Sequence, residues 1–214
     1  MITRKSGGKR VRMIRYMQRK GPHIEPKPLV LIVCEGKETE PNYFHSIRKD
    51  YKLNKKRIEI VGGDKCGTDP KSVVEYAKKR KMELRKDKLE YESIWCVYDR
   101  DEHQRFNDAN VQARDLKFKV TFSNPCFELW YLLHFQDQDA PIERDEVIKS
   151  LKPRIPDYDK TTDYYEKLKK CQNEAIIRAE KLREKHRREN SEETKNPSTS
   201  VDLLVKYLNS ISNS

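Results

Sequence analysis

Two short apolar runs that each end on acidic residues constrain the fold of this chain more than any other feature. Residues 94–98 are Ile, Trp, Cys, Val and Tyr, and Asp99 and Asp101 follow them. Residues 29–34 are Leu, Val, Leu, Ile, Val and Cys, and Glu35 follows them. Continuous apolar runs of this length are typical of strands that are buried on both faces, as in parallel sheets. Because side chains alternate along a strand, Asp99 and Asp101 are expected on the same side.

Helical patterns between further apolar runs indicate an α/β fold. Strands are also expected at 58–61 and 118–122, and helices at about 41–51, 71–89 and 102–116. Thr39 is the expected N-cap of the first helix, and Thr68 or Asp69 that of the second. Strands that alternate with helices form parallel sheets with right-handed crossovers. We therefore expect a four-stranded, mainly parallel sheet with flanking helices.

Composition divides the chain into three parts. Residues 1–27 form a basic arm, which carries eight Lys or Arg and no acid up to His23. Residues 28–136 contain the predicted α/β core. Residues 137–214 are predicted to form a helical extension packed on the core, with helices at 145–151, 162–189 and 198–211. The arm fits two interpretations equally, a segment that follows nucleic-acid phosphates and a frayed terminus.

The acids at the ends of the strands are candidates for one site. Sites in open α/β sheets form outside the carboxyl ends of the strands, so Glu35, Asp99 and Asp101 are expected to converge. Carboxylate oxygens at such a position suit a hard divalent cation such as Mg²⁺. An Asp-x-Asp segment after a strand also occurs as an ordinary charged turn. The pattern therefore leaves both interpretations open.

One further acid stands in apolar surroundings. The predicted helix at 125–135 is apolar around nearly its whole circumference, except for Glu128 in its first turn. A carboxylate among apolar side chains must pair, bind a metal or take up a proton. The alternative is that Glu128 lies on an exposed edge, where the helix dipole favours an acid.

Charge and cysteine content narrow the functional classes. The net charge is +11 and 38% of the residues are charged, a balance that favours a polyanionic partner, most often nucleic acid. The five cysteines are scattered without a Cys-x-x-Cys pair, as expected of reduced thiols in the cytoplasm. No apolar run reaches the roughly 18 residues of a membrane span, and no nucleotide-binding P-loop motif occurs.

Several segments in a fixed order resemble a known family. Strand-Glu-Gly at 34–36 followed by strand-Asp-x-Asp at 98–101 is similar to the Toprim domain of topoisomerases, primases and the OLD-family nucleases. More specifically, four segments resemble the RloB-like family, at 34–44, 98–103, 123–130 and 196–199. Members of that family are encoded near restriction and abortive-infection genes of bacteria and archaea. The resemblance covers about residues 28–208 and implies a Toprim-like, metal-dependent nuclease in anti-phage defence.

Nuclease chemistry gives each of the acids an expected role. Asp99 and Asp101 are the expected ligands of Mg²⁺ or Mn²⁺, with Glu35 as a further ligand or general base. Glu40 is a candidate ligand for a second metal. So is Glu128, by resemblance to the Ser-x-Glu segment of related nucleases, although the segment here reads Asn-Pro-Cys-Phe-Glu at 124–128.

Basic residues are expected to assist catalysis and to hold the substrate. Lys160, on a loop after the sheet, is predicted to stabilise the transition state. Lys37 and Arg100 lie nearer to the acids in sequence and suit the same role. The expected nucleic-acid contacts come from Lys37 and Arg100, from the arm and from the basic end of the long C-terminal helix, namely Arg10, Arg12, Arg183 and Arg187.

Two other functions stay open at this point. The chain fits a nucleic-acid-binding module without catalytic activity. It also fits a regulatory partner of a defence ATPase, because it has no ATP-binding motif of its own. A homodimer is compatible with either function, and the substrate of the predicted nuclease is DNA or RNA, including tRNA.

Overall fold

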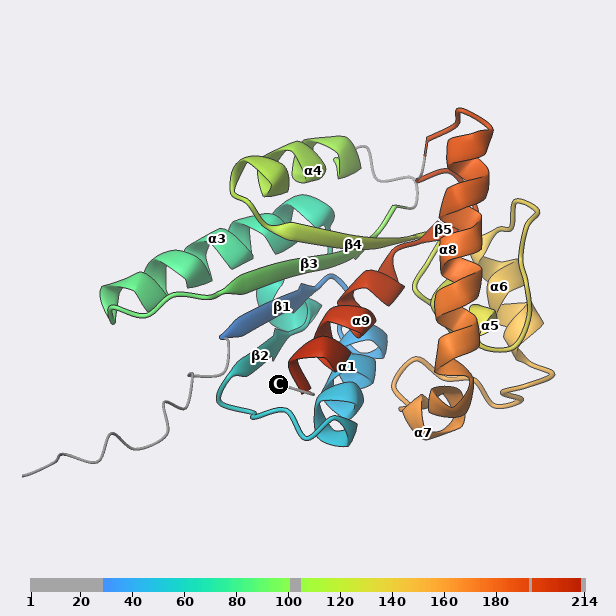
Figure 1. The fold of residues 1–214 in the computed structure, drawn as a ribbon, viewed down its shortest axis with the longest axis horizontal. Coiled ribbons are helices and arrows are strands. Elements are labelled where there is room, and N and C mark those ends of the chain that lie inside the picture. The colour runs from blue at the N-terminus through green and yellow to red at the C-terminus, as the bar shows by residue number, and fades with distance from the viewer. Residues whose placement is uncertain (1–28, 101–104, 193, 213–214) are drawn as a thin grey trace, which may run out of the picture.

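A five-stranded sheet runs through the centre of the molecule (Figure 1). The structure is a computed structural model that describes residues 29–100, 105–192 and 194–212. The strands are β1 (Val30–Cys34), β2 (Ile58–Val61), β3 (Ser93–Asp99), β4 (Lys119–Asn124) and β5 (Ser198–Thr199). The helices up to the end of the sheet's parallel part are α1 (Thr39–Asp50), α2 (Gly63–Cys66), α3 (Pro70–Lys86) and α4 (Phe106–Asp115). After β4 come α5 (Glu128–Leu133), α6 (Arg144–Leu151), α7 (Tyr165–Leu168), the 3₁₀ helix η1 (Lys169–Cys171), α8 (Gln172–Arg188) and α9 (Val201–Ser212).

The strand order is β2-β1-β3-β4-β5, and the first four strands are parallel. All four predicted strands are present, and β3 extends to include Asp99. The predicted strand count is wrong, because Ser198 and Thr199 form a fifth strand antiparallel to β4. This segment was expected to begin the last helix, which starts only at Val201. A strand of two residues is too short to show a period-two pattern in the sequence.

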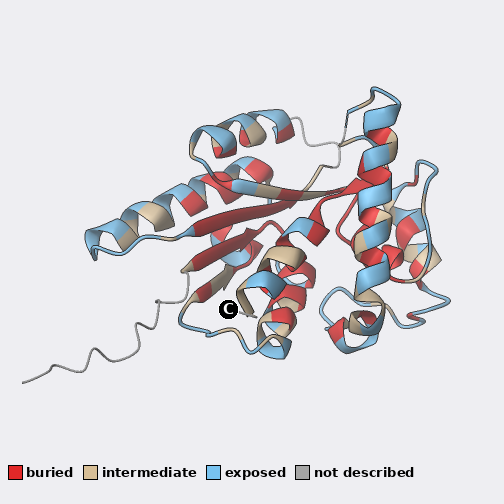
Figure 2. Ribbon diagram, viewed as in Figure 1, coloured by how far each residue is buried: buried red, intermediate tan, exposed pale blue. Residues whose placement is uncertain are grey.

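Side chains on alternate positions of the central strands build two separate apolar layers. On β1, Leu31 and Val33 face the layer covered by α3 and α4. Val30 and Ile32 face the opposite layer, which α1, α5, α8 and α9 cover. Figure 2 shows β1 and β3 buried along their length, as the continuous apolar runs predict.

One of the predicted helix starts is confirmed, and two other predictions about helices are wrong. Asp69 caps α3 and accepts hydrogen bonds from the backbone N–H groups of Lys71 and Ser72, as predicted. The predicted cap at Thr39 is wrong, since Thr39 is already helical and its hydroxyl donates to the Lys160 carbonyl. The long helix expected at 162–189 is interrupted, so that α7 and η1 precede α8.

The segments after residue 137 share one apolar layer with the sheet. That layer contains strand residues such as Ile32 and Val97 together with Val147 of α6, Leu182 of α8 and Leu204 of α9. In Figure 1, α5, α6 and α8 lie beyond the end of the sheet at which β3 and β4 finish. In the part of the chain that the structure describes, every helix is too short or too polar to span a bilayer. The predicted division at residues 136 and 137 stays a prediction.

Candidate active site at the carboxyl ends of the strands

Glu35 and Asp99 meet at one rim of the sheet. β1 and β3 are adjacent and parallel, and the register pairs Cys34 with Val97. One residue further along, the Glu35 backbone N–H donates to the Val97 carbonyl at 2.9 Å. The Glu35 carboxylate Oε2 accepts a hydrogen bond from the Asp99 backbone N–H at 3.0 Å. The expectation that these two acids converge is therefore confirmed.

The turn after β1 brings a third carboxylate to this rim. Glu40 lies in the first turn of α1 and is 6% exposed. Its carboxylate packs against the Cα of Gly36, where a Cβ atom would stand only 1.7 Å from Glu40 Oε2. A side chain at position 36 would move this carboxylate from its position, so the placement of Glu40 at this rim depends on the glycine.

Glu128 is the fourth carboxylate and is not on an exposed edge. It is 3% exposed at the start of α5. The Tyr158 hydroxyl donates to Glu128 Oε1 at 2.8 Å, and Lys160 Nζ lies 3.7 Å from the same oxygen. The interpretation of Glu128 as a buried, paired acid is confirmed, and the alternative of a solvated helix edge is wrong.

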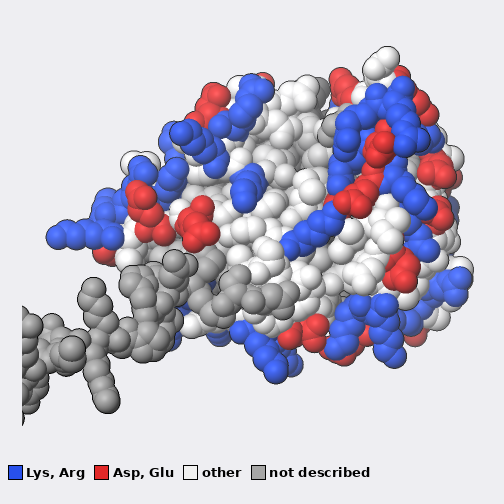
Figure 3. Space-filling model, in the orientation of Figure 1, with Lys and Arg blue, Asp and Glu red and all other residues white. Residues whose placement is uncertain are grey.

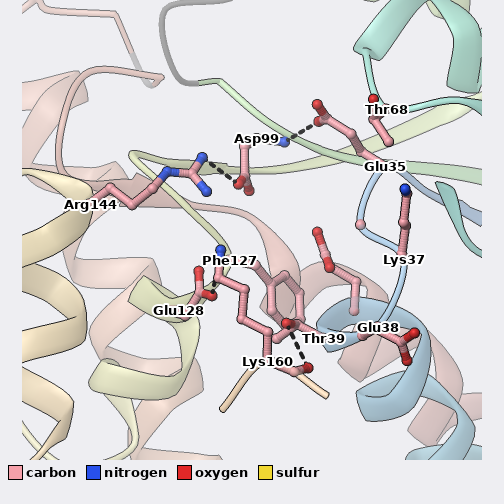
Figure 4. A pocket seen from close by; sticks show the side chains of 12 residues that line it. Glu35, Lys37, Glu38, Thr39, Thr68, Asp99, Phe127, Glu128, Arg144 and Lys160 are labelled. Carbon is pink, nitrogen blue, oxygen red and sulfur yellow. Dashed lines mark hydrogen bonds and ion pairs between the residues drawn. The ribbon is translucent and has the colours of Figure 1, made fainter. Parts of the chain in front are cut away.

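Two cations from the C-terminal segments face these acids. Arg144, the first residue of α6, places Nη2 3.1 Å from Asp99 Oδ2. Lys160 approaches Glu128 from the loop between α6 and α7. Figure 4 shows Asp99 standing between Arg144 and Glu35. Sequence reasoning selected Lys160 but missed Arg144, since nothing in the polar segment around Arg144 distinguishes it from other surface arginines.

These groups line one cavity of about 480 Å³ (Figure 4). Five acids, three cations and the turn that joins β1 to α1 line it; the lining residues are Glu35, Gly36, Lys37, Glu38, Thr39, Glu40, Thr68, Asp99, Phe127, Glu128, Arg144 and Lys160. The sheet side of the cavity therefore carries most of the carboxylates together with Lys37, and the C-terminal side contributes the two cations Arg144 and Lys160.

Burial and mutual repulsion make Glu35, Glu40 and Asp99 resist ionisation. Burial raises the pKa of Glu35 to about 7, against the hydrogen bond from Asp99, and the Glu40 charge adds to the rise. Burial raises the pKa of Glu40 to about 7 as well; its backbone hydrogen bonds oppose the rise and the Glu128 charge increases it. Burial and the Glu40 charge raise the pKa of Asp99 well above its usual value, although Arg144 opposes this. The site therefore carries more carboxylates than its own cations neutralise.

The donor chemistry of the cavity fits a hard divalent cation. All candidate ligands are carboxylate oxygens, the ligands preferred by Mg²⁺ and Mn²⁺. Excess buried carboxylate, with raised pKa values, is the electrostatic condition that a bound cation relieves. Among residues 29–100, 105–192 and 194–212, however, no three acidic, His or Cys side chains form a ready-made metal group. Asp101, a predicted ligand, lies outside the described residues.

Of the other basic residues predicted to bind nucleic acid, some lie at the cavity and others away from it. Lys37 is exposed and lines the cavity. Arg100 pairs with Glu192 at 3.0 Å and lies over the Phe106 ring. Arg187 is exposed on α8, where Lys and Arg gather between acidic side chains on the face seen in Figure 3. It does not line the cavity. Arg10 and Arg12 lie outside the described residues.

The prediction that Arg183 contacts nucleic acid is wrong. Arg183 is 6% exposed, and its guanidinium makes a two-pronged ion pair with Asp202, with Nη2 2.8 Å from Oδ2. Nη1 also donates to the Thr199 carbonyl. This side chain holds α8, β5 and α9 together. The sequence did not reveal this burial, because Arg183 stands in a run of basic residues at the end of α8. Its inward direction depends on the phase of the helix and on a partner acid 19 residues away.

The fold and the cavity define an α/β protein with a buried acidic site at the carboxyl ends of adjacent parallel strands. The family model described as RloB-like protein matches residues 30–208. The chain therefore belongs to the RloB-like family. No curated protein and no solved structure matches it significantly.

Proposed function

We propose that this protein is a divalent-cation-dependent nuclease that hydrolyses phosphodiester bonds of DNA or RNA, with a role in anti-phage defence. The proposal includes a relation of its sheet to the Toprim domain and of the chain to the OLD-family nucleases. tRNA is among the candidate substrates. The observation that carries the proposal is the convergence of Glu35 and Asp99 on adjacent strands, with Glu40 and Glu128 in the same cavity.

The residues of the cavity suit phosphodiester hydrolysis. Asp99, with Glu35 and the predicted ligand Asp101, would hold Mg²⁺ or Mn²⁺, and Glu40 and Glu128 would extend the ligand set. The cation would supply charge neutralisation at the phosphoryl oxygens and a more acidic water. Alternatively, Glu35 would act as the general base, and its pKa of about 7 in the metal-free cavity suits a group that takes the proton of an attacking water near neutral pH. Lys37, Arg144 and Lys160 are positioned to attract a phosphate into the cavity.

The decisive experiment compares Asp99→Asn with wild type. The purified chain is incubated with Mg²⁺ or Mn²⁺ and with single-stranded DNA, double-stranded DNA or tRNA, and cleavage rates are measured. Asp99→Asn keeps the size of the side chain and should lower the rate by about 10² to 10³-fold, the usual effect of removing one key electrostatic group. Asp115→Asn, an exposed acid at the end of α4, is the matched control and should cleave like wild type. Equal rates for Asp99→Asn and Asp115→Asn would reject the proposed site.

The two ion pairs in the cavity favour a second candidate function. Because Asp99 is paired with Arg144 and Glu128 with Lys160, these acids can be held without a metal. The chain would then be a nucleic-acid-binding module without catalytic activity. Under that function, oligonucleotide binding is unchanged by chelation of divalent cations, and no cleavage is found with any of the substrates.

A further inference from the structure

The ion pair between Arg144 and Asp99 joins the two chemically different walls of the cavity. Arg144 Nη2 lies 3.1 Å from Asp99 Oδ2, and the two residues are 45 positions apart in the chain. The Asp99 side chain is only 13% exposed, whereas that of Arg144 is 35% exposed. The acid is thus fixed within the site, while the guanidinium reaches it from the side that opens to solvent.

The backbone that carries Arg144 is well anchored. Arg144 is the first residue of α6, and Glu143 caps this helix. The Glu143 side chain accepts from the backbone of Glu146, and the Glu146 side chain accepts from the backbone of Glu143, which forms a capping box. The guanidinium can therefore move by rotation of its long side chain while the backbone stays in place, and the adjoining cavity of about 480 Å³ provides room for it.

A divalent cation and the Arg144 guanidinium would repel each other if both were bound to the Asp99 carboxylate. A divalent ion held by the Asp99 carboxylate would lie close to the guanidinium that now pairs with it, and like charges at such a separation repel even in high dielectric. A guanidinium released from a carboxylate has the planar fork that also matches phosphate oxygens.

We propose that Arg144 is the internal counter-cation of Asp99, which it neutralises until a divalent cation binds, and that its guanidinium then becomes available to a substrate phosphate. This inference rests on the proposed function and concerns the order of events at the same site. It assigns to α6, outside the sheet, the role of coupling cation binding to phosphate binding.

Cation binding to the isolated protein tests the first half of this inference without any measurement of cleavage. Isothermal titration with Mn²⁺ is carried out on metal-free wild type, Arg144→Gln, Arg144→Lys and the control Arg85→Gln. Arg85 pairs with Glu90 on the exposed end of α3, so Arg85→Gln makes the same charge change away from the cavity. Arg144→Gln should bind Mn²⁺ about tenfold more tightly than wild type, and Arg85→Gln should match wild type. Arg144→Lys keeps the competing charge and should stay close to wild type.

The second half is tested with a short single-stranded DNA that carries phosphorothioate linkages to resist cleavage. Wild type should bind this oligonucleotide several-fold more tightly with Mn²⁺ than with a chelator, because Arg144 is then released. Arg144→Gln should lose most of this gain while Arg85→Gln keeps it.

The outcomes separate this inference from the proposed function. If wild type binds Mn²⁺ and Arg144→Gln binds it equally or more weakly, competition for Asp99 is rejected and the nuclease proposal stands. If Arg144→Lys binds Mn²⁺ as tightly as Arg144→Gln does, the effect is not one of charge and the inference is also rejected. If no variant binds Mn²⁺, the proposed function and this inference both fail. Should Arg144→Gln not fold, Arg144→Lys with the oligonucleotide still decides, since an unchanged Mn²⁺-dependent gain would overturn the assigned role of the guanidinium fork.

Discussion

The two sides of the cavity differ in their balance of acids and cations. The sheet and its connections supply the acids Glu35, Glu40 and Asp99 and the exposed Lys37, with Glu128 at the start of α5. The segments after β4 and α5 supply Arg144 and Lys160. Glu35, Glu40 and Glu128 are buried and the Asp99 side chain is 13% exposed, whereas the side chains of Arg144 and Lys160 are 35% and 52% exposed.

This difference indicates different tasks for the two regions. Buried carboxylates with raised pKa values destabilise the fold unless something relieves them, so their grouping in one cavity points to function. Partly exposed cations contribute little to stability and can exchange partners. We therefore expect variants of the sheet acids to have large effects on function, and variants of the C-terminal cations to have smaller ones.

The largest expected effect comes from Glu35→Gln. We expect cleavage to fall by about 10² to 10³-fold, since a neutral amide can replace Glu35 neither as an anionic ligand nor as a general base. The free energy of unfolding at pH 8 should rise by about 1 to 3 kcal/mol, because burial disfavours the charged form of Glu35 and a neutral amide avoids this cost. The amide oxygen can still accept the hydrogen bond from Asp99. Denaturant unfolding and a cleavage assay measure both effects.

Glu59→Gln is the matched control for this gain in stability. Burial alone would raise the pKa of Glu59, but hydrogen bonds from Arg80 and Tyr91 lower it below its usual value. The charged form is thus the stabilised one, and Glu59→Gln should destabilise the protein by about 1 kcal/mol without affecting cleavage. If Glu35→Gln lowered the free energy of unfolding as much as Glu59→Gln does, the charged form of Glu35 would stabilise the fold. The contrast between the two regions would then be lost.

Much of the fold, and the acid half of the site, followed from the sequence, because strand ends have a fixed position in a parallel sheet. Once the runs before Glu35 and Asp99 are identified as neighbouring strands, their register brings the acids together. The cation half depends on loops and on the phase of short helices, for which the sequence carries no periodic signal. Arg144 was missed for this reason, and Arg183 was assigned to the surface although it is buried against Asp202.

The pH dependence of stability should be of intermediate size. Glu35 and Glu40 have pKa values of about 7 in the folded protein, above their usual value of 4.5. Between these pH values the folded state keeps protons that the unfolded state has released, so the stability of the metal-free protein falls as pH rises. The slope is at most about 1.4 kcal/mol per pH unit for each proton. Mn²⁺ at saturation should flatten this slope, because the bound cation favours the ionised acids.

Unfolding of wild type and Glu35→Gln across pH 5 to 8, roughly the range in which these acids titrate, isolates this effect. The comparison is needed because burial lowers the pKa of His134 to about 4, which gives a slope of the opposite sign below its usual value of 6.5. The difference between the free energies of unfolding of wild type and Glu35→Gln at each pH no longer contains the contribution of His134. It gives the contribution of Glu35. Parallel curves would mean that Glu35 does not titrate in this range, and the electrostatic account of the cavity would need revision.

The smallest effect is expected for Lys160→Gln. Lys160 Nζ lies 3.7 Å from Glu128 Oε1 and its side chain is 52% exposed, so solvent screens the pair and its loss should change stability by less than about 0.5 kcal/mol. Cleavage should fall by about tenfold or less, mainly through weaker substrate binding and thus a higher KM, because Lys160 approaches the cavity from its open side. Lys167→Gln, at an exposed position on α7, removes the same charge without touching the cavity and serves as the control. A loss with Lys160→Gln as large as that with Asp99→Asn, confined to kcat, would instead support the role in transition-state stabilisation predicted from the sequence and place part of the chemistry on the C-terminal wall.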